Sequence, residues 1–357
     1  MSLDQGRAQA FCKRFGLKLP ILLAPMAGAC PPSLSIAVMN AGSLGACGAL
    51  LMRPSEIAAW ADEVRAKSNG PFQFNLWTPD PPPQRDRAHE DEVRAFLERF
   101  GPAVAANAGD VTPLDFAAQC EALLAIEPAV VSSIMGLYPP DFVDKLKKSG
   151  IAWFATASTV AEARAAEDAG ADVVVAQGME AGGHRGCFDA AQAERQLVGL
   201  FALIPAVVDA VKVPVVATGG IADARGVAAA LLLGASAAQI GTALLRCPEA
   251  KLHPAWADAL ARTAPEERVF SGRAGRSIAT KYVRTATAAD APPPAPYPVQ
   301  RGLTAAMRSE ALGAGDVERM QVWAGQSARL ARAEPAGKVV QDIWDDAHKL
   351  IGWSDFA

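Results

Sequence analysis

The sequence lacks a long uninterrupted hydrophobic run, a basic cluster and closely spaced cysteines. Each of these absences argues against one class of protein. Its most apolar window, residues 228–245, is broken by two glycines and three polar residues. That window therefore fits a buried helix followed by a buried strand better than a membrane span. Residues 1–20 also lack the apolar centre of a signal peptide. We expect a soluble protein that does not associate with a membrane.

The charges and the cysteines narrow the class further. Lys and Arg number 34 against 38 Asp and Glu, a net charge of −4, and no basic run is concentrated anywhere. Nucleic acid and anionic surfaces are therefore poor partners. The six cysteines are scattered without a C-x-x-C pair, and no histidine stands at metal-ligand spacing. This pattern predicts reduced thiols in the cytoplasm and neither a disulfide framework nor a metal site.

What the sequence does contain is apolar material arranged in short alternating segments. Hydrophobic residues make up 51% of the 357 residues, enough for a large packed core. Amphipathic segments separate most of the apolar runs, and several end in Ala-Gly or Ser-Gly, typical of a helix C-cap before a strand. The predicted strands are residues 20–26, 43–49, 72–77, 129–135, 151–158, 171–178, 213–220 and 237–245.

Eight apolar strands alternating with helices predict an α/β protein with a (β/α)₈ TIM barrel. We place the barrel in residues 1–246, with an insertion around 78–128. Residues 247–357 form a helical extension packing over the barrel, with 322–333 as its most regular helix. The alternative is a doubly wound open sheet, whose G-x-G-x-x-G fingerprint should follow the first strand. Residues 24–32, "APMAGACPP", do not supply it.

In a (β/α)₈ barrel the functional site lies at the C-terminal ends of the strands. The glycines after the seventh and eighth strands predict a phosphate site, because loops at these two positions commonly present backbone N–H groups to a phosphate. The alternative is that these glycines only make tight turns. The candidate residues at the strand ends are Ala24, Pro25, Met26, Asn75, Gln177, Gly182, Gly183, His184, Gly219, Gly220, Gln239, Ile240, Gly241 and Thr242.

His184 is the candidate catalytic residue. Gly182 and Gly183 precede it, so the backbone can lie close to a ligand and no side chain shields the imidazole. With an ordinary pKa near 6.5, histidine accepts a proton near neutrality. A structural role remains the alternative for His184 and for Asn75. The cysteines and Trp77, Trp153 and Trp323 are interpreted as packing residues.

These motifs resemble the nitronate monooxygenases, also called 2-nitropropane dioxygenases. The resemblance rests on "APMAG", "FNLW", "AQGMEAGGHRG" and residues 213–245, and it extends to "RVFSGRAGRS" and "WAGQSARL" near the C-terminus. It implies non-covalent FMN at Asn75, Gln177, Gly182, the Gly219–Gly220 pair and residues 239–242. It also implies His184 as the catalytic residue, acting as a base only when a neutral nitroalkane is the substrate.

The implied reaction passes one electron from an alkyl nitronate to the flavin and then uses O₂, giving a carbonyl compound and nitrite. Two alternatives stay open: an FMN-dependent enoyl-ACP reductase, which carries a similar histidine motif, and a non-catalytic flavin-binding barrel. Ile134 stands where the family usually has histidine, and "AGRSIATKYVRT" departs from the family pattern. We expect these two departures to alter the substrate or to weaken the activity that the resemblance implies. The sequence leaves the oligomeric state open, with a homodimer among the alternatives.

Overall fold

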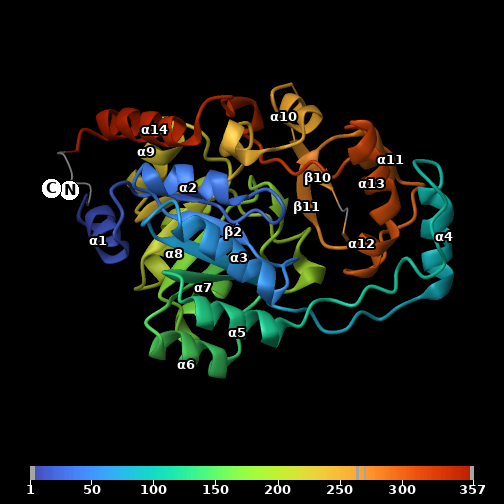
Figure 1. The fold of residues 1–357 in the computed structure, drawn as a ribbon, viewed down its shortest axis with the longest axis horizontal. Coiled ribbons are helices and arrows are strands. Elements are labelled where there is room, and N and C mark those ends of the chain that lie inside the picture. Colours follow the sequence, from blue (N-terminus) through green and yellow to red (C-terminus); the bar gives the residue numbers. More distant parts are fainter. Residues whose placement is uncertain (1–4, 263–264, 269–270, 354–357) are drawn as a thin grey trace.

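The structure, a computed structural model, describes residues 5–262, 265–268 and 271–353. Its centre is a parallel barrel surrounded by helices (Figure 1). The strand order is β1-β9-β8-β6-β5-β4-β3-β2. A parallel bridge between Leu22 and Leu44 joins β1 to β2 and closes the ring. The strands are β1 (Ile21–Leu23), β2 (Gly45–Gly48), β3 (Phe72–Trp77), β4 (Val130–Ile134), β5 (Ala152–Ala157), β6 (Val173–Gln177), β8 (Val215–Thr218) and β9 (Ala237–Ile240).

The predicted (β/α)₈ barrel is therefore confirmed, and each of the eight strands falls within a predicted run. The last run is shorter than predicted. After Ile240 the chain leaves the strand at Gly241, whose ψ of −81° is not extended, and turns into a short 3₁₀ helix, η2 (Thr242–Leu244). An apolar run thus changes conformation at its glycine, which periodicity alone does not show.

Helices cover the outside of the barrel between successive strands (Figure 1). Proline in the first turn starts three of them, where its missing N–H costs no hydrogen bond. The barrel helices are α2 (Pro32–Asn40), α3 (Pro54–Arg65), α5 (Phe116–Ile126), α6 (Pro140–Lys148), α7 (Val160–Asp168), α8 (Leu200–Ala210) and α9 (Ala224–Leu232).

The barrel interior is apolar at one end and polar at the other. Helix α1 (Gln5–Phe15) packs Phe11 and Phe15 against inward-facing strand residues such as Leu22 and Phe154. Above this layer lies Gln73, whose Nε2 donates to Gln239 Oε1 at 3.2 Å. Apolar side chains therefore fill the N-terminal end, and amides face the C-terminal mouth.

The insertion and the C-terminal extension form a common lid. Helix α4 (Arg87–Leu97) lies away from the barrel, beside α12 (Figure 1). Its Val93 and Leu97 share an apolar cluster with Tyr282 and Leu303 of the extension. Helix α5 instead contacts the barrel helix α3. The elements of the extension that belong to this lid are η3 (Pro248–Ala250), α10 (Pro254–Leu260), β10 (Pro265–Arg268), β11 (Gly275–Ile278), α11 (Lys281–Ala286), α12 (Val299–Leu303), α13 (Ala305–Ala314) and η4 (Ala328–Leu330). A short 3₁₀ helix, η1 (Ala190–Gln192), lies in the connection between β6 and α8.

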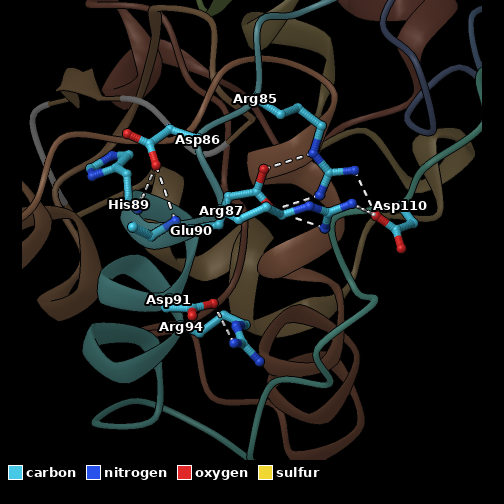
Figure 2. Close-up of polar contacts among 9 residues, drawn as sticks. Arg85, Asp86, Arg87, His89, Glu90, Asp91, Arg94 and Asp110 are labelled. Carbon is cyan, nitrogen blue, oxygen red and sulfur yellow. Dashed lines mark hydrogen bonds and ion pairs between the residues drawn. The ribbon is translucent and has the colours of Figure 1, made fainter.

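An ion-pair network anchors the insertion (Figure 2). Glu90 is 4% exposed and accepts from Nε and Nη2 of Arg85 at 2.7 and 2.5 Å, while Arg85 Nη1 reaches Asp110 Oδ1 at 2.6 Å. Asp86 accepts from the backbone N–H of Ala88 and His89 and so caps α4. The Arg85–Asp110 contact ties together the two segments that flank α4.

The prediction of a regular helix over residues 322–333 is wrong. This segment is extended, with only the turn η4, because Trp323 bridges Ser277 of β11. The regular C-terminal helix is α14 (Ala336–Ile351), which packs on α9 and α2. Within the described ranges, no helix combines the length and the apolar composition that a membrane crossing requires.

Candidate active site

A cavity opens at the C-terminal mouth of the barrel, and it gathers the residues predicted from the strand ends. All the candidate residues line it except Ile240. Ile240 is fully buried in the outer core, because side chains alternate along β9 and Gln239 takes the inward position. Its only contribution near the mouth is a carbonyl that accepts from Ala24 N at 2.9 Å.

His184 lies in the wall of this cavity between two indoles. Its ring centroid is 4.6 Å from that of Trp77 and 4.7 Å from that of Trp323. Its Nε2 is 2.6 Å from Ser271 Oγ. Trp77 and Trp323, which the sequence suggested as packing residues, therefore pack on the candidate catalytic ring itself.

The pKa of His184 differs from the expectation of titration near neutrality. Burial, together with the nearby positive charges of Arg273 and Arg301, lowers the pKa of His184 to about 3. The imidazole is therefore neutral at physiological pH. The sequence could not show this shift, because it arises from residues of the lid.

The two positions before His184 require glycine for different structural reasons. A Cβ on Gly182 would lie 2.5 Å from Gly325 N and 2.6 Å from the carbonyl carbon of Ala324. The absence of a side chain at Gly182 thus allows the lid segment with Ala324 and Gly325 to pack directly against the loop that carries His184. Gly183 has φ of +76° and open space around it, so its glycine is needed for backbone conformation.

Two amide side chains hold the loop and face the cavity. Gln177 accepts from Gly186 N at 2.7 Å and donates from Nε2 to His184 O at 3.3 Å, so it fixes the loop that carries the imidazole. Asn75 donates from Nδ2 to both Ser132 O and Ser132 Oγ at 3.1 Å. No described residue donates to Asn75 Oδ1, which leaves this oxygen to a ligand.

The loops after β8 and β9 present backbone donors to the cavity. Among the described residues, the N–H groups of Gly219, Gly220 and Gly241 meet no hydrogen-bond acceptor. Gly219 and Gly220 have φ of +117° and +67°, so a side chain at either would be strained. Backbone N–H groups without an acceptor ahead of the N-terminus of α9 are the kind of arrangement that binds anions, so the predicted phosphate site stays a prediction that this geometry allows.

Lid residues complete the cavity, and sequence reasoning missed most of them. Arg273 pairs with Asp80 at 2.6 Å, whereas the Arg301 side chain forms no ion pair within the part of the chain that the structure describes. Ile134, the departure from the family pattern, also lines the cavity. Of the motif "RVFSGRAGRS", Val269 and Phe270 lie outside the described residues. Besides Trp323, the lining residues of the extension that were not among the candidates are Trp256, Ser271, Tyr297, Arg301, Gln321, Gly325 and Ser327.

The two charged neighbours of His184 in its loop have structural partners. Glu180 accepts from Leu200 N at 2.9 and 3.1 Å and so caps α8. Arg185 is 4% exposed and donates to the Met179 carbonyl. Neither side chain lines the cavity, in line with the absence of any chemical step assigned to them from sequence.

In (β/α)₈ barrels the loops after the last two strands frequently hold a phosphate-bearing molecule, and here these loops carry backbone N–H groups that meet no acceptor among the described residues. The family model described as nitronate monooxygenase matches residues 9–346. The chain therefore belongs to the nitronate monooxygenase family and is an oxidoreductase, and the family implies a flavin cofactor.

Sequence and structure similarity to individual proteins supports the same family assignment. A nitronate monooxygenase of Paraburkholderia phytofirmans is 37% identical over 350 residues, covering 95% of each chain. One of Pseudomonas aeruginosa is 38% identical over 346 residues, covering 94% of this chain and 98% of the other. Among solved structures, nitroalkane oxidase of Streptomyces ansochromogenes superposes with a TM-score of 0.85 at 34% identity, covering 95% of this chain and 98% of that one. FabK of Thermotoga maritima gives 0.74 at 26%, covering 96% and 97%.

Proposed function

We propose that this protein binds FMN without a covalent bond and oxidises alkyl nitronates with O₂ to a carbonyl compound and nitrite. The observation that carries the proposal is the cavity in which free backbone donors and His184 face the same space. Backbone donors suit the phosphate that distinguishes FMN from riboflavin, and none of the described residues that line the cavity has an acidic side chain that would repel it. Bound there, the flavin supplies the electron transfer.

The chain itself supplies the binding surfaces for cofactor and substrate. The N–H groups of Gly219, Gly220 and Gly241 would hold the phosphate. Asn75 Oδ1 would accept a hydrogen bond from the isoalloxazine, and Met26 would pack on it. These residues line one cavity, so the cofactor would lie within reach of His184.

Charge and exclusion of water favour an anionic substrate. A nitronate is an anion, and Arg301 offers at the cavity wall a cation that pairs with no acidic side chain of the described residues. Trp77 and Trp323 surround His184 with apolar surface, which strengthens electrostatic attraction by excluding water. A neutral imidazole binds an anion by a hydrogen bond and withdraws a proton only from a neutral nitroalkane.

The cofactor can be tested directly. Purified protein should be yellow, and heat denaturation should release a flavin that comigrates with FMN in chromatography. Release of FAD would contradict the assignment of FMN, and release of riboflavin would contradict the phosphate assignment as well. A colourless protein whose thermal midpoint does not rise on addition of FMN would contradict flavin binding at this cavity.

The reaction class is tested by mixing without oxygen. We expect propionate 3-nitronate to change the flavin absorbance within the mixing experiment, whereas NADH leaves it unchanged. The opposite result, rapid bleaching by NADH alone, would favour the enoyl-ACP reductase alternative. Admission of O₂ to the nitronate sample should then restore the absorbance and yield nitrite, measured colorimetrically.

The compartment and assembly remain proposals. All six cysteines are free and buried, and burial raises the pKa of Cys12, Cys30 and Cys247 to about 12. Thiols held in this way are unreactive, which fits a protein of the reducing cytoplasm. We propose small molecules and O₂ as its partners, and a homodimer as the assembly to test by light scattering.

A further inference from the structure

The strongest unexplained contact in the cavity joins Ser271 to His184. Ser271 belongs to the C-terminal extension, is 1% exposed and places its Oγ 2.6 Å from Nε2 of the imidazole. Both residues line the cavity. A contact this short between two buried polar atoms requires that one of them donates and the other accepts.

The surroundings of Ser271 decide which atom donates. Nε2 is the sole hydrogen-bond partner of Ser271 Oγ within the described ranges. If His184 donated from Nε2–H, the serine hydrogen would be left buried without an acceptor. If Ser271 donates to the Nε2 lone pair, its hydrogen is satisfied and only oxygen lone pairs are left over, which costs less.

We infer that Ser271 is a positioning residue: its hydroxyl donates to Nε2 and so holds His184 as the tautomer that carries its proton on Nδ1. This inference rests on the proposed function, because its consequence concerns the nitronate. Nδ1 has no partner in the described part of the chain, so the Nδ1–H is available to a molecule in the cavity.

The tautomer decides which substrate His184 serves. An Nδ1–H donates to an anion, so the resting enzyme is prepared for a preformed nitronate. Removing the α-proton of a neutral nitroalkane needs a lone pair at the same position, and the tautomer set by Ser271 does not provide it. A donor at Nε2 also favours neutral imidazole, in agreement with the low pKa of His184.

The first test reads the tautomer without any turnover. The chain has four histidines, so long-range ¹H–¹⁵N correlation spectra of ¹⁵N-histidine-labelled protein are simple, and the signal missing from His184→Asn belongs to residue 184. We expect a protonated Nδ1 and an unprotonated Nε2 in wild type and in Ser271→Thr. In Ser271→Ala we expect Nε2–H to become populated. A wild-type signal from Nε2–H would overturn the inference.

The second test reads the substrate ratio. In Ser271→Ala the kcat/KM for nitroalkane divided by that for nitronate should rise roughly three- to tenfold, the size of one neutral hydrogen bond. Ser271→Thr should restore the wild-type ratio because it keeps the hydroxyl. Ser35→Ala is the control: it removes a buried hydroxyl that donates to Ala46 O at 2.7 Å, outside the cavity, and should leave the ratio unchanged.

The two tests separate this inference from the proposed function. A wild type that oxidises no nitronate contradicts the proposed function, and the NMR spectra alone then decide the tautomer. An unchanged tautomer in Ser271→Ala, whether or not its activity falls, would show that Ser271 has only a packing role. Because the wild-type spectrum needs no variant, poor folding of Ser271→Ala does not remove the test.

Discussion

Replacing His184 with asparagine is expected to abolish most nitroalkane turnover while leaving a larger share of nitronate turnover. Nitroalkane turnover uses the minor tautomer of His184, in which Nδ1 carries a lone pair, and asparagine has no lone pair basic enough to replace it. General-base catalysis contributes roughly 10²–10⁴-fold, and the low pKa of His184 places the expected loss toward the lower end of this range. Its amide still donates a hydrogen bond, so binding of the nitronate anion is partly kept. Steady-state kcat/KM for a nitroalkane and for its preformed nitronate, measured on the same preparation, gives the ratio.

The pH dependence sharpens this expectation. With the pKa of His184 lowered to about 3, the imidazole stays neutral down to acidic pH. Wild-type kcat/KM for a preformed nitronate should therefore show no loss from protonation of His184 between about pH 8 and pH 5. An ordinary histidine, with a pKa of about 6.5, would become protonated within this range. Equal losses on both substrates in His184→Asn, or loss of bound FMN, would contradict the catalytic role and indicate a structural one.

Replacing Gly182 with alanine is expected to open the mouth of the barrel. The new Cβ would overlap Gly325 N and the carbonyl carbon of Ala324 at 2.5 and 2.6 Å, and backbone atoms cannot rotate away as a side chain can. The segment that carries Trp323 must then move off His184. We expect a loss of about 1–3 kcal/mol in the free energy of unfolding, as for overpacking in a core, and weaker flavin binding.

Two alanine variants serve as controls for Gly182→Ala. At Gly183 a Cβ meets nothing, so Gly183→Ala should cost only the backbone strain of φ +76°, about 1–2 kcal/mol. At Gly313, in the exposed part of α13, alanine also meets nothing and should stabilise by about 0.5–1 kcal/mol. Thermal unfolding with flavin fluorescence measures all three. Tight flavin binding in Gly182→Ala would show that the lid segment does not close the site.

The barrel and the position of its site at the C-terminal mouth could be predicted from sequence, because the local sequence patterns and the topology lead to the same fold. Strands buried on both faces give continuous apolar runs, and parallel strands bring their C-terminal ends to one mouth. Asn75, Gln177 and the glycines after β8 and β9 could therefore be placed together without any long-range information. Ile240 was misplaced only because the alternation beyond Gln239 was not applied to it.

The conformation and contacts of the lid could not be predicted from sequence, because its segments have little hydrophobic periodicity and their contact partners are distant in sequence. Residues 322–333 look helical by composition, yet Trp323 pairs with β11 and Gly325 packs on Gly182. Ser271 and Arg301 lie 87 and 117 positions from His184, and no local pattern connects them with it. Sequence patterns report the local conformation of a segment, whereas these contacts follow from how the extension folds back.

The amino-acid sequence by itself determined the (β/α)₈ barrel, the glycine-rich loops after β8 and β9 and the presence of a histidine at the mouth, because each depends on residues within one strand and its following loop. Tertiary structure alone decided the state of that histidine. Its neutral form results from desolvation by Trp77 and Trp323 and from the charges of Arg273 and Arg301. Desolvation and charge act through space, so they are set only when the lid meets the barrel.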